Sequence, residues 1–417
     1  MPTVKFLGAL SQILLVAISI SANMKSKRSV IFTVLFILSV APFGSSYHNV
    51  FNVVDFGAVG NGKTDDTEAF KKAWAATCGS VGRYSTLIVP RGKTFLVNSY
   101  MFSGGCKASS IYFTLDGNLV APPRGRISNI KSWITFYSVN SLTIIGSGQM
   151  DGQGYSWWPK KCFEDPQGCQ INIDRPTLLS FESCNMLQVL NVRLINSPRN
   201  HIVVNNCNHV FFSGISISAP RQSPNTDGIN IGSSSFVTIT KMNIASGDDC
   251  ITFLPGSSNI NVSHITCNPG HGISVGSVYT GKVEKVLVEH CYLSNTQNGV
   301  RIKTKQGGSG YVRDIHFRDI HMTSVSNPII IDQYYFSPIN LTSAVAISNV
   351  EFSDIRGTTQ GDLAIKLACS QSVPCRDVHL WDVNLRSVIK NKPVSSYCLS
   401  VHGPRCPNCS PRVPCLG

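Results

Sequence analysis

Residues 229–267 read INIGSSSFVTITKMNIASGDDCITFLPGSSNINVSHITC. The pattern Φ-x-Φ-x-x-Φ-x-Φ, in which Φ is an apolar residue, occurs twice in this stretch, at Val237–Ile244 and at Ile260–Cys267. On both sides of the x-x step the apolar residues recur with a period of two. Side chains of a strand point alternately to opposite faces, so each copy predicts two short strands joined by a bend, with the apolar face turned inward.

The same pattern recurs on both sides of this stretch. Further copies begin at Leu187, Val210, Val286, Ile315, Val350 and Val378, and consecutive copies start about 23 to 35 residues apart, as in a solenoid. Most copies are accompanied by one more short apolar segment: Ile202–Val204, Ile229–Ile231, Ile251–Phe253, Ile273–Val275, Val300–Ile302 and Ile329–Ile331. Leucine-rich repeats would need leucines and helices, and a propeller would need about four antiparallel strands per unit. The sequence therefore predicts an all-β fold, a single-stranded right-handed parallel β-helix with one coil per repeat.

Residues 64–75 follow a different pattern, with acidic residues first and then an apolar stripe of Phe70, Ala73 and Trp74. Thr64 or Asp65 can cap the first turn, so we expect a short helix here. An open β-helix end exposes an unpaired strand edge. We therefore expect this helix to cap the N-terminal end of the solenoid.

The composition narrows the class of protein and of partner. The 417 residues include 34 Gly and only 14% charged residues, which excludes a helical bundle and a disordered tail. The formal net charge of +13 favours an anionic partner: nucleic acid, an acidic membrane or an acidic polysaccharide. Beyond residue 46 the chain has no Lys/Arg run typical of a nucleic-acid-binding arm, so we expect no nucleic-acid partner.

Residues 1–46 are interpreted as a signal or targeting region, and residues 47–417 as one catalytic β-helix domain. A basic stretch, a short apolar run at Val30–Val40 and small residues at its end predict a signal peptide at 24–46, with Met24 as an alternative start. A membrane anchor is the alternative, but both apolar runs are short for a spanning helix, so we expect no stable membrane association. All 15 cysteines lie beyond residue 46, which suits a secreted protein, and their odd number leaves at least one unpaired. Three sequons, at Asn261, Asn340 and Asn408, are candidate glycosylation sites.

Polar residues precede four of the additional strands. Aligning the apolar residues of these strands gives the same place on four successive coils to Asp227, Asp249, His271 and Asn298. Asp248 lies one residue before this column, and Arg301 and Lys303 lie a few residues after it. Because adjacent strands are about 4.8 Å apart, the three carboxylates should crowd together.

Crowded carboxylates repel one another and titrate together, so stability alone does not favour them. Two kinds of site suit such a cluster: general acid–base catalysis and a bound cation. Three carboxylates on a β-helix could hold Ca²⁺, as in pectate lyases, with Arg301 as the base. His271 is a poor Ca²⁺ ligand. The spacing favours a hydrolase and leaves the metal site as an alternative.

Four motifs, in this order and spacing, resemble those of the polygalacturonases of glycoside hydrolase family 28: Asn225-Thr226-Asp227, Gly247-Asp248-Asp249, Gly270-His271-Gly272 and Arg301-Ile302-Lys303. The resemblance extends from about Val50 to Cys415 and includes Asp151-Gly152-Gln153-Gly154 and the segment before Tyr335. Its details resemble the plant branch. Two positions depart from it: Lys305, where plant members often have Trp, and Phe336, where they often have Cys.

The resemblance implies inverting hydrolysis of α-1,4-galacturonosidic bonds in polygalacturonic acid, the backbone of pectin. Asp248 resembles the general acid, which two neighbouring anions should help to keep its proton, and Asp227 and Asp249 resemble the pair that activates water. His271 would orient or tune the acid. Substrate would be bound by Asn225, Arg301, Lys303 and Tyr335. No metal or cofactor is implied.

Other expectations concern the biology of the chain. We expect a secreted protein of the cell wall or apoplast, a monomer, with pectin as substrate and an inhibitor protein as a partner suggested by the family. Endo action is favoured over exo action. A Ca²⁺-dependent lyase and a non-catalytic pectin-binding protein remain the alternatives.

Eleven of the 15 cysteines fall into three groups. Cys250 and Cys267 match a disulfide of the family, and Cys369 with Cys375 is spaced for a short loop bridge. Three cysteines in strand-like segments are candidate buried free thiols: Cys184, Cys207 and Cys291. Pairing among the last four cysteines of the chain is not predicted.

Overall fold

The computed structural model describes residues 48–125, 131–165, 174–335, 339 and 341–416. The chain divides into two units, 1–45 and 46–417, and every described residue belongs to the second. The predicted signal region and Phe336 lie outside the described residues.

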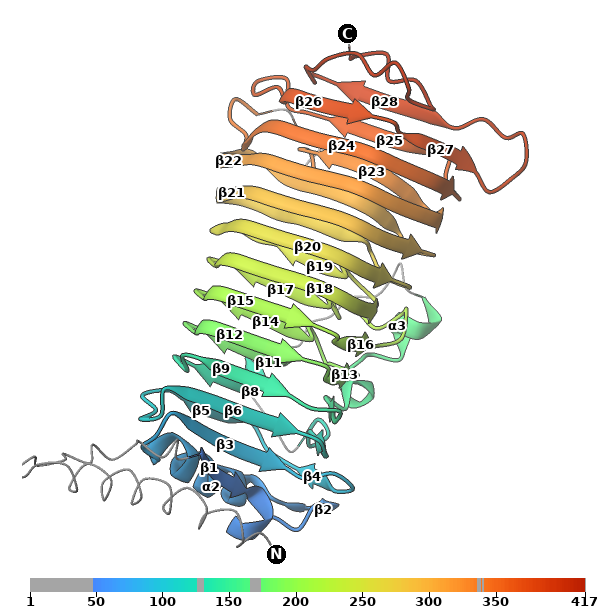
Figure 1. Ribbon diagram of the computed structural model, residues 1–417. Coiled ribbons are helices and arrows are strands. Elements are labelled where there is room, and N and C mark those ends of the chain that lie inside the picture. Colours follow the sequence, from blue (N-terminus) through green and yellow to red (C-terminus); the bar gives the residue numbers. More distant parts are fainter. Residues whose placement is uncertain (1–47, 126–130, 166–173, 336–338, 340, 417) are drawn as a thin grey trace, which may run out of the picture. The chain divides into compact units, whose positions relative to one another are not determined.

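The second unit is a right-handed parallel β-helix in which three ladders of parallel strands run along the stack of coils (Figure 1). Ladder A contains β1 (His48–Asn52), β3 (Tyr84–Val89), β6 (Ser110–Leu115), β9 (Leu142–Ile145), β12 (Asn185–Leu190), β15 (Asn208–Ser213) and β26 (Arg376–Trp381). Ladder B contains β2 (Asn61–Asp65), β4 (Thr94–Leu96), β7 (Asn118–Val120), β10 (Gln149–Asp151), β13 (Arg193–Ile195), β16 (Ser216–Ser218) and β27 (Asn384–Ser387).

Ladder C carries the site described below. It contains β5 (Tyr100–Ser103), β8 (Ser132–Tyr137), β11 (Thr177–Glu182), β14 (Ile202–Asn205), β17 (Ile229–Gly232), β19 (Ile251–Phe253), β23 (Asn327–Asp332), β25 (Leu363–Ala368) and β28 (Ser395–Leu399). Some strands continue through a bend. Three belong to both A and B: β18 (Ser235–Ala245), β20 (Ser257–Cys267) and β24 (Ala346–Thr359). Two pass through all three ladders: β21 (Ile273–Ser294) and β22 (Asn298–Val325).

The bend at the x-x step has a single backbone cause. The second x residue of every predicted copy has a positive φ between 47° and 69°: Asn191, Gly214, Lys241, His264, His290, Asp319, Asp354 and Asp382. A residue in the left-handed region turns the chain sharply between two extended segments. The bend therefore separates ladder A from ladder B at the same point of each coil, as the sequence pattern predicted.

The apolar residues of the repeat fill the interior of the coils. Side chains of one kind stack on successive coils, and one stack is aromatic. Ring centroids lie 4.9 Å apart for Phe102 and Phe136, 5.7 Å for Phe136 and Phe181, and 6.0 Å for Phe181 and Phe212. This continuous core confirms the predicted all-β solenoid.

The N-terminal helix α2 (Thr67–Gly79) buries Phe70, Ala73 and Trp74, the predicted stripe. The indole ring of Trp74 packs against Phe102 at 5.0 Å, so the helix closes the aromatic end of the core. Its bounds differ from the predicted 64–75, because Asn61–Asp65 pairs with β4 as strand β2. Three shorter helices are η1 (Val53–Phe56), η2 (Gly154–Ser156) and α3 (Lys161–Glu164). In the described part of the chain no helix has the length and apolar character needed to span a bilayer.

Disulfides lie at both ends of the stack and beside ladder C. The described pairs are Cys78–Cys106, Cys250–Cys267, Cys369–Cys375, Cys398–Cys415 and Cys406–Cys409. Among the described residues, three cysteines are free and buried: Cys184, Cys207 and Cys291. The two cysteine pairs expected from sequence are thus both present.

Candidate active site

Four successive coils bring the predicted polar column together at the start of ladder C. The register pairs Ile229 with Ile251, Ile251 with Ile273 and Ile273 with Val300. Two residues before these positions stand Asp227, Asp249, His271 and Asn298. The next outward-facing positions along the strands carry Asn230, Thr252, Ser274 and Arg301, so a second polar row lies beside the column.

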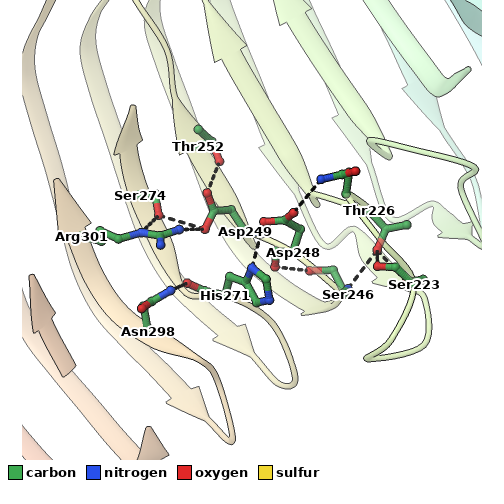
Figure 2. Close-up of polar contacts among 12 residues, drawn as sticks. Ser223, Thr226, Ser246, Asp248, Asp249, Thr252, His271, Ser274, Asn298 and Arg301 are labelled. Carbon is green, nitrogen blue, oxygen red and sulfur yellow. Dashed lines mark hydrogen bonds and ion pairs between the residues drawn. The ribbon is translucent and has the colours of Figure 1, made fainter. Parts of the chain in front are cut away.

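Asp249 is the most enclosed of the three carboxylates, with 1% of its side chain exposed. Its Oδ1 accepts hydrogen bonds from Arg301 Nη2 at 2.7 Å and Ser274 Oγ at 2.9 Å. Its Oδ2 accepts from Lys303 Nζ at 2.7 Å and Thr252 Oγ1 at 3.2 Å. Figure 2 shows Arg301, Ser274 and Thr252 turned toward this carboxylate. Four donors and two positive charges compensate a buried anion that would otherwise be costly.

Asp248 points the other way, toward His271 (Figure 2). Its Oδ1 lies 3.0 Å from His271 Nδ1 and accepts from the backbone N–H of Asp249 at 2.9 Å. Its Oδ2 accepts one described hydrogen bond, from Asn225 Nδ2 at 3.3 Å. About a fifth of the side chain, 21%, is exposed. Asp248 therefore has one oxygen with two contacts and a more open oxygen with a single, longer contact.

Backbone and hydroxyl contacts fix the turn that carries Asp248. Thr226 Oγ1 accepts from the Gly247 N–H at 2.9 Å, and Ser246 Oγ donates to the Asp248 carbonyl at 2.9 Å. Ser223 contacts the Thr226 hydroxyl at 2.7 Å. The threonine between Asn225 and Asp227 thus connects the turn of one coil to the turn of the next.

Asp227 is held by neutral groups. With its amide nitrogen turned toward Asp227, Asn230 donates to Oδ2 at 3.0 Å and its oxygen accepts from Asn200 Nδ2 at 2.9 Å. The fully buried His201 lies below, with Nδ1 3.1 Å from the Asp227 carbonyl oxygen. Burial lowers the pKa of His201 to about 4, so this imidazole is neutral and serves as a structural support.

The environments of Asp227 and Asp248 move their pKa values in opposite directions. Desolvation, followed by the charges of Asp248 and Asp249, raises the pKa of Asp227 well above its usual range. Desolvation also acts on Asp248, but the hydrogen bond and charge of His271, together with Lys303, outweigh it and lower the pKa to about 2. The expectation that crowding keeps a proton on Asp248 is therefore not met in the unliganded site, where the carboxyl whose pKa is raised by crowding is Asp227.

Tyr335 borders the two cations of the site. Its ring centroid lies 5.7 Å from Arg301 Cζ and 5.5 Å from Lys303 Nζ. Both cations also contact Asp249, so they lie between a carboxylate and an aromatic face. A cation can be attracted by the π-face of an aromatic ring in this range of distances. The expected substrate-binding residues Arg301, Lys303 and Tyr335 thus lie together, next to the aspartates.

One group of described residues has the donor set for a metal ion, namely Asp248, Asp249 and His271, whose ligand atoms lie within 4.8 Å of one another. The geometry disfavours a resident Ca²⁺ at this place. Both oxygens of Asp249 already contact positive groups, Arg301 and Lys303. Ca²⁺ takes six to eight oxygen ligands and gains little from an imidazole.

Sequence reasoning did not find several residues of the site. Thr252 and Ser274 surround Asp249, Asn230 contacts Asp227, and Arg175 contacts Asn225. The first three could have been found, because they occupy the outward positions next to the polar column in the aligned strands. Arg175 carries no such signal, since it lies before β11 and reaches the site across two coils.

Comparison with known proteins agrees with this fold. Residues 78–407 match the model of the glycosyl hydrolases family 28. A probable polygalacturonase of Arabidopsis thaliana is 42% identical over 393 residues, which cover 91% of this chain and 83% of the relative. Polygalacturonase-2 of Solanum lycopersicum is 39% identical over 365 residues, 85% of this chain and 78% of the relative.

Solved structures show the same architecture. The polygalacturonase of Erwinia carotovora ssp. carotovora superposes with a TM-score of 0.64 at 25% identity, covering 80% of this chain and 94% of that one. An exopolygalacturonase of Thermotoga maritima superposes with a TM-score of 0.68 at 22% identity, covering 85% of this chain and 91% of that one. At this identity the likeness supports the fold and nothing more. The chain belongs to family 28 of the glycosyl hydrolases.

Proposed function

We propose that this chain is a polygalacturonase that hydrolyses the α-1,4-galacturonosidic bonds of polygalacturonic acid with inversion. The observation that carries the proposal is the placement of three carboxylates and two cations on neighbouring rungs of ladder C. Carboxylates can supply the acid and the base of a glycosidase, and cations beside them suit a substrate with one carboxylate per sugar. Membership of family 28 and the polygalacturonase relatives support the same reaction.

Asp248 is the proposed general acid. Its more open oxygen, Oδ2, can approach the glycosidic oxygen, while His271 and the Asp249 N–H hold Oδ1. In the unliganded site the pKa of Asp248 is about 2, so substrate must raise it. Bound substrate excludes water and brings its own carboxylates, and both effects favour the protonated acid. General acid catalysis then needs a proton on Asp248, while Asp227 and Asp249 stay free to accept one from the attacking water.

Asp227 and Asp249 are proposed to activate the attacking water. Asp227 has a described partner on Oδ2 only, the amide of Asn230. Asp249 starts with four donors. A substrate carboxylate that enters beside Tyr335 competes for Arg301 and Lys303, and this competition frees oxygens of Asp249 for water. Arg301 can bind that carboxylate through two parallel hydrogen bonds.

Product analysis on polygalacturonic acid tests the proposal. Wild type and Asp248→Asn are compared in EDTA, and the products are resolved by length. Saturated oligomers from wild type, with none from the variant, are expected. An unsaturated product absorbing in the ultraviolet, with activity lost in EDTA, would instead indicate a Ca²⁺-dependent lyase, and binding without cleavage would indicate a pectin-binding protein.

Finer parts of the proposal have their own measurements. We propose endo action, which predicts intermediate-length oligomers as the first products.

We also propose a secreted cell-wall protein from which residues 1–46 are removed, leaving the β-helix domain 47–417. Edman sequencing of the secreted protein checks this, and an N-terminus upstream of Ser26 would contradict it. Monomeric mass in solution, and inhibition by a secreted inhibitor protein, are the expectations for partners.

A further inference from the structure

Arg175 is a buried cation close to the aspartates, on the side that faces the N-terminal coils. It lies just before β11 and is 5% exposed. Its Nη1 donates to the carbonyl oxygens of Pro198 at 2.8 Å and Pro224 at 2.6 Å. These prolines belong to the loops that lead into β14 and β17. One guanidinium thereby joins the loops of three successive coils.

The charge of Arg175 has no carboxylate partner among the described residues. All its hydrogen-bond acceptors are neutral, and its buried Nε has no partner. Burial lowers the pKa of Arg175 to about 10, and the charged groups that influence it are Arg199, Asp227 and Asp248. A buried unpaired charge is strongly unfavourable. Loop packing alone would be served better by a neutral side chain.

Arg175 also determines how Asn225 faces the acid. Its Nη2 donates to Asn225 Oδ1 at 2.8 Å, so the amide oxygen is the acceptor on that side. The amide nitrogen must then face Asp248, where it donates to Oδ2 at 3.3 Å. The reversed amide would set an oxygen against a carboxylate and a nitrogen against a guanidinium. Arg175 thus selects the orientation in which Asn225 restrains the more open oxygen of Asp248.

We propose that Arg175 is a positioning residue for Asp248, acting through Asn225, and that its fixed positive charge helps to set the pH range of activity. The proposal rests on the proposed hydrolytic function. The other charged or titratable groups that face Asp248 are His271, Lys303, Asp227 and Asp249. The charge of Arg175 adds to those of His271 and Lys303 on the opposite side of the acid.

Two substitutions separate position from charge. Arg175→Lys keeps the positive charge but loses the forked donors of the guanidinium. We expect kcat to fall about tenfold or more, because misplacing a catalytic group is costly. Both limbs of the pH profile of kcat/KM should stay in place, because the charge is kept. Arg175→Gln also loses the charge. Without a nearby cation the carboxyl pKa values rise, so both limbs should move to higher pH. KM should change little in either variant.

Controls separate this role from a purely structural one. Arg193→Gln removes an exposed arginine on ladder B and should match wild type. Asn225→Ala should reproduce the loss in kcat, and adding it to Arg175→Lys should cost little more, because both act on one contact. Circular dichroism and thermal unfolding report the fold.

The inference is overturned if folded Arg175→Lys retains wild-type kcat, or if folded Arg175→Gln loses activity with its pH limbs unmoved. If Arg175→Gln does not fold, the inference is tested by Arg175→Lys and by the double-mutant cycle of this variant with Asn225→Ala. Additive losses in kcat in that cycle would mean that the two residues act independently, and would also overturn the inference. Absence of cleavage by wild type would contradict the proposed function instead.

Discussion

Ladder A and ladder C use the same rung spacing for opposite purposes. On the outer face of ladder A the register sets Glu284 beside Arg313 and His316 beside Glu351. These pairs bond at 2.7 and 3.2 Å and are partly exposed. At the start of ladder C the register sets Asp227 beside Asp249, like charge beside like. Neighbouring rungs of ladder A give each of these carboxylates a hydrogen-bonding partner, which serves stability. Neighbouring rungs at the start of ladder C crowd carboxylates together, which serves chemistry.

The largest expected effect comes from removing one of the crowded carboxylates at the start of ladder C. Asp227→Asn should lower kcat by about 10²- to 10⁴-fold, the usual contribution of general acid–base catalysis. Initial rates of reducing-end release on polygalacturonic acid measure it. Glu351→Gln on ladder A is the matched variant and should keep wild-type kcat. A variant at Asp227 with more than a tenth of wild-type activity would remove this residue from the proposed pair.

The next effect concerns the ion pairs of the two ladders. Arg301→Met leaves Asp249 buried with a single cation, so the free energy of unfolding should fall by about 3–5 kcal/mol. Arg318→Met removes a partner of Glu351 on ladder A and should cost less than about 1 kcal/mol. Urea unfolding followed by circular dichroism gives both values. Equal losses would mean that burial does not distinguish the two ladders.

A third expectation is a gain in stability. The raised pKa of Asp227 means that the free energy of unfolding falls as pH rises above about 3.8, because the carboxyl of the unfolded chain then releases its proton before the same carboxyl in the folded chain does. Asp227→Asn should therefore stabilise the protein at neutral pH, by about 0.5–2 kcal/mol, the gain typical of one favourable substitution. Unfolding at pH 7 and pH 3 measures it. A gain that does not shrink at pH 3 would contradict the electrostatic cause.

The smallest expected effect is a loss of stability on ladder A, opposite in sign to the gain expected from Asp227→Asn. Arg318, Ser353 and His316 lower the pKa of Glu351 from 4.5 to about 2. A lowered pKa gives stability that is present above pH 4.5 and is lost as pH falls toward 2. Glu351→Gln should thus destabilise slightly at pH 7, by less than about 1 kcal/mol, with no difference from wild type near pH 2. The urea midpoints of both proteins at pH 7 and pH 2 check this.

Much of the fold could be predicted because the repeat is local and periodic. The copies from Leu187 onward carry their apolar residues at fixed offsets, except that Gly357 takes the last place of the copy at Val350. The aligned second strands predicted the register of Asp227, Asp249 and His271. The earlier coils, β1 to β10, were not found from the repeat. The helix bounds also shifted, because pairing of Asn61–Asp65 with β4 overrode the local capping signal.

The main residues of the site could be predicted from the sequence, but the arrangement of their side chains could not. Register places residues on rungs, and it does not say which way a side chain turns. Asp248 turns to His271 while Asp249 turns to Arg301 and Lys303. The first of these choices is what lowers the pKa of Asp248. Arg175 was invisible for a further reason, since it approaches from a loop outside the repeat.

The two disulfides at the ends of the stack have a consequence for how this protein comes apart. Cys78–Cys106 ties helix α2 to the chain beyond β5, and Cys398–Cys415 ties β28 to the last described residues. A stack of coils with bare ends frays from its termini, one coil after another, while its middle survives. Here a disulfide holds each end of the stack, so coil-by-coil unfolding from either end is blocked. We therefore expect heating to unfold the middle coils together with the ends, so that the active site is lost with the fold.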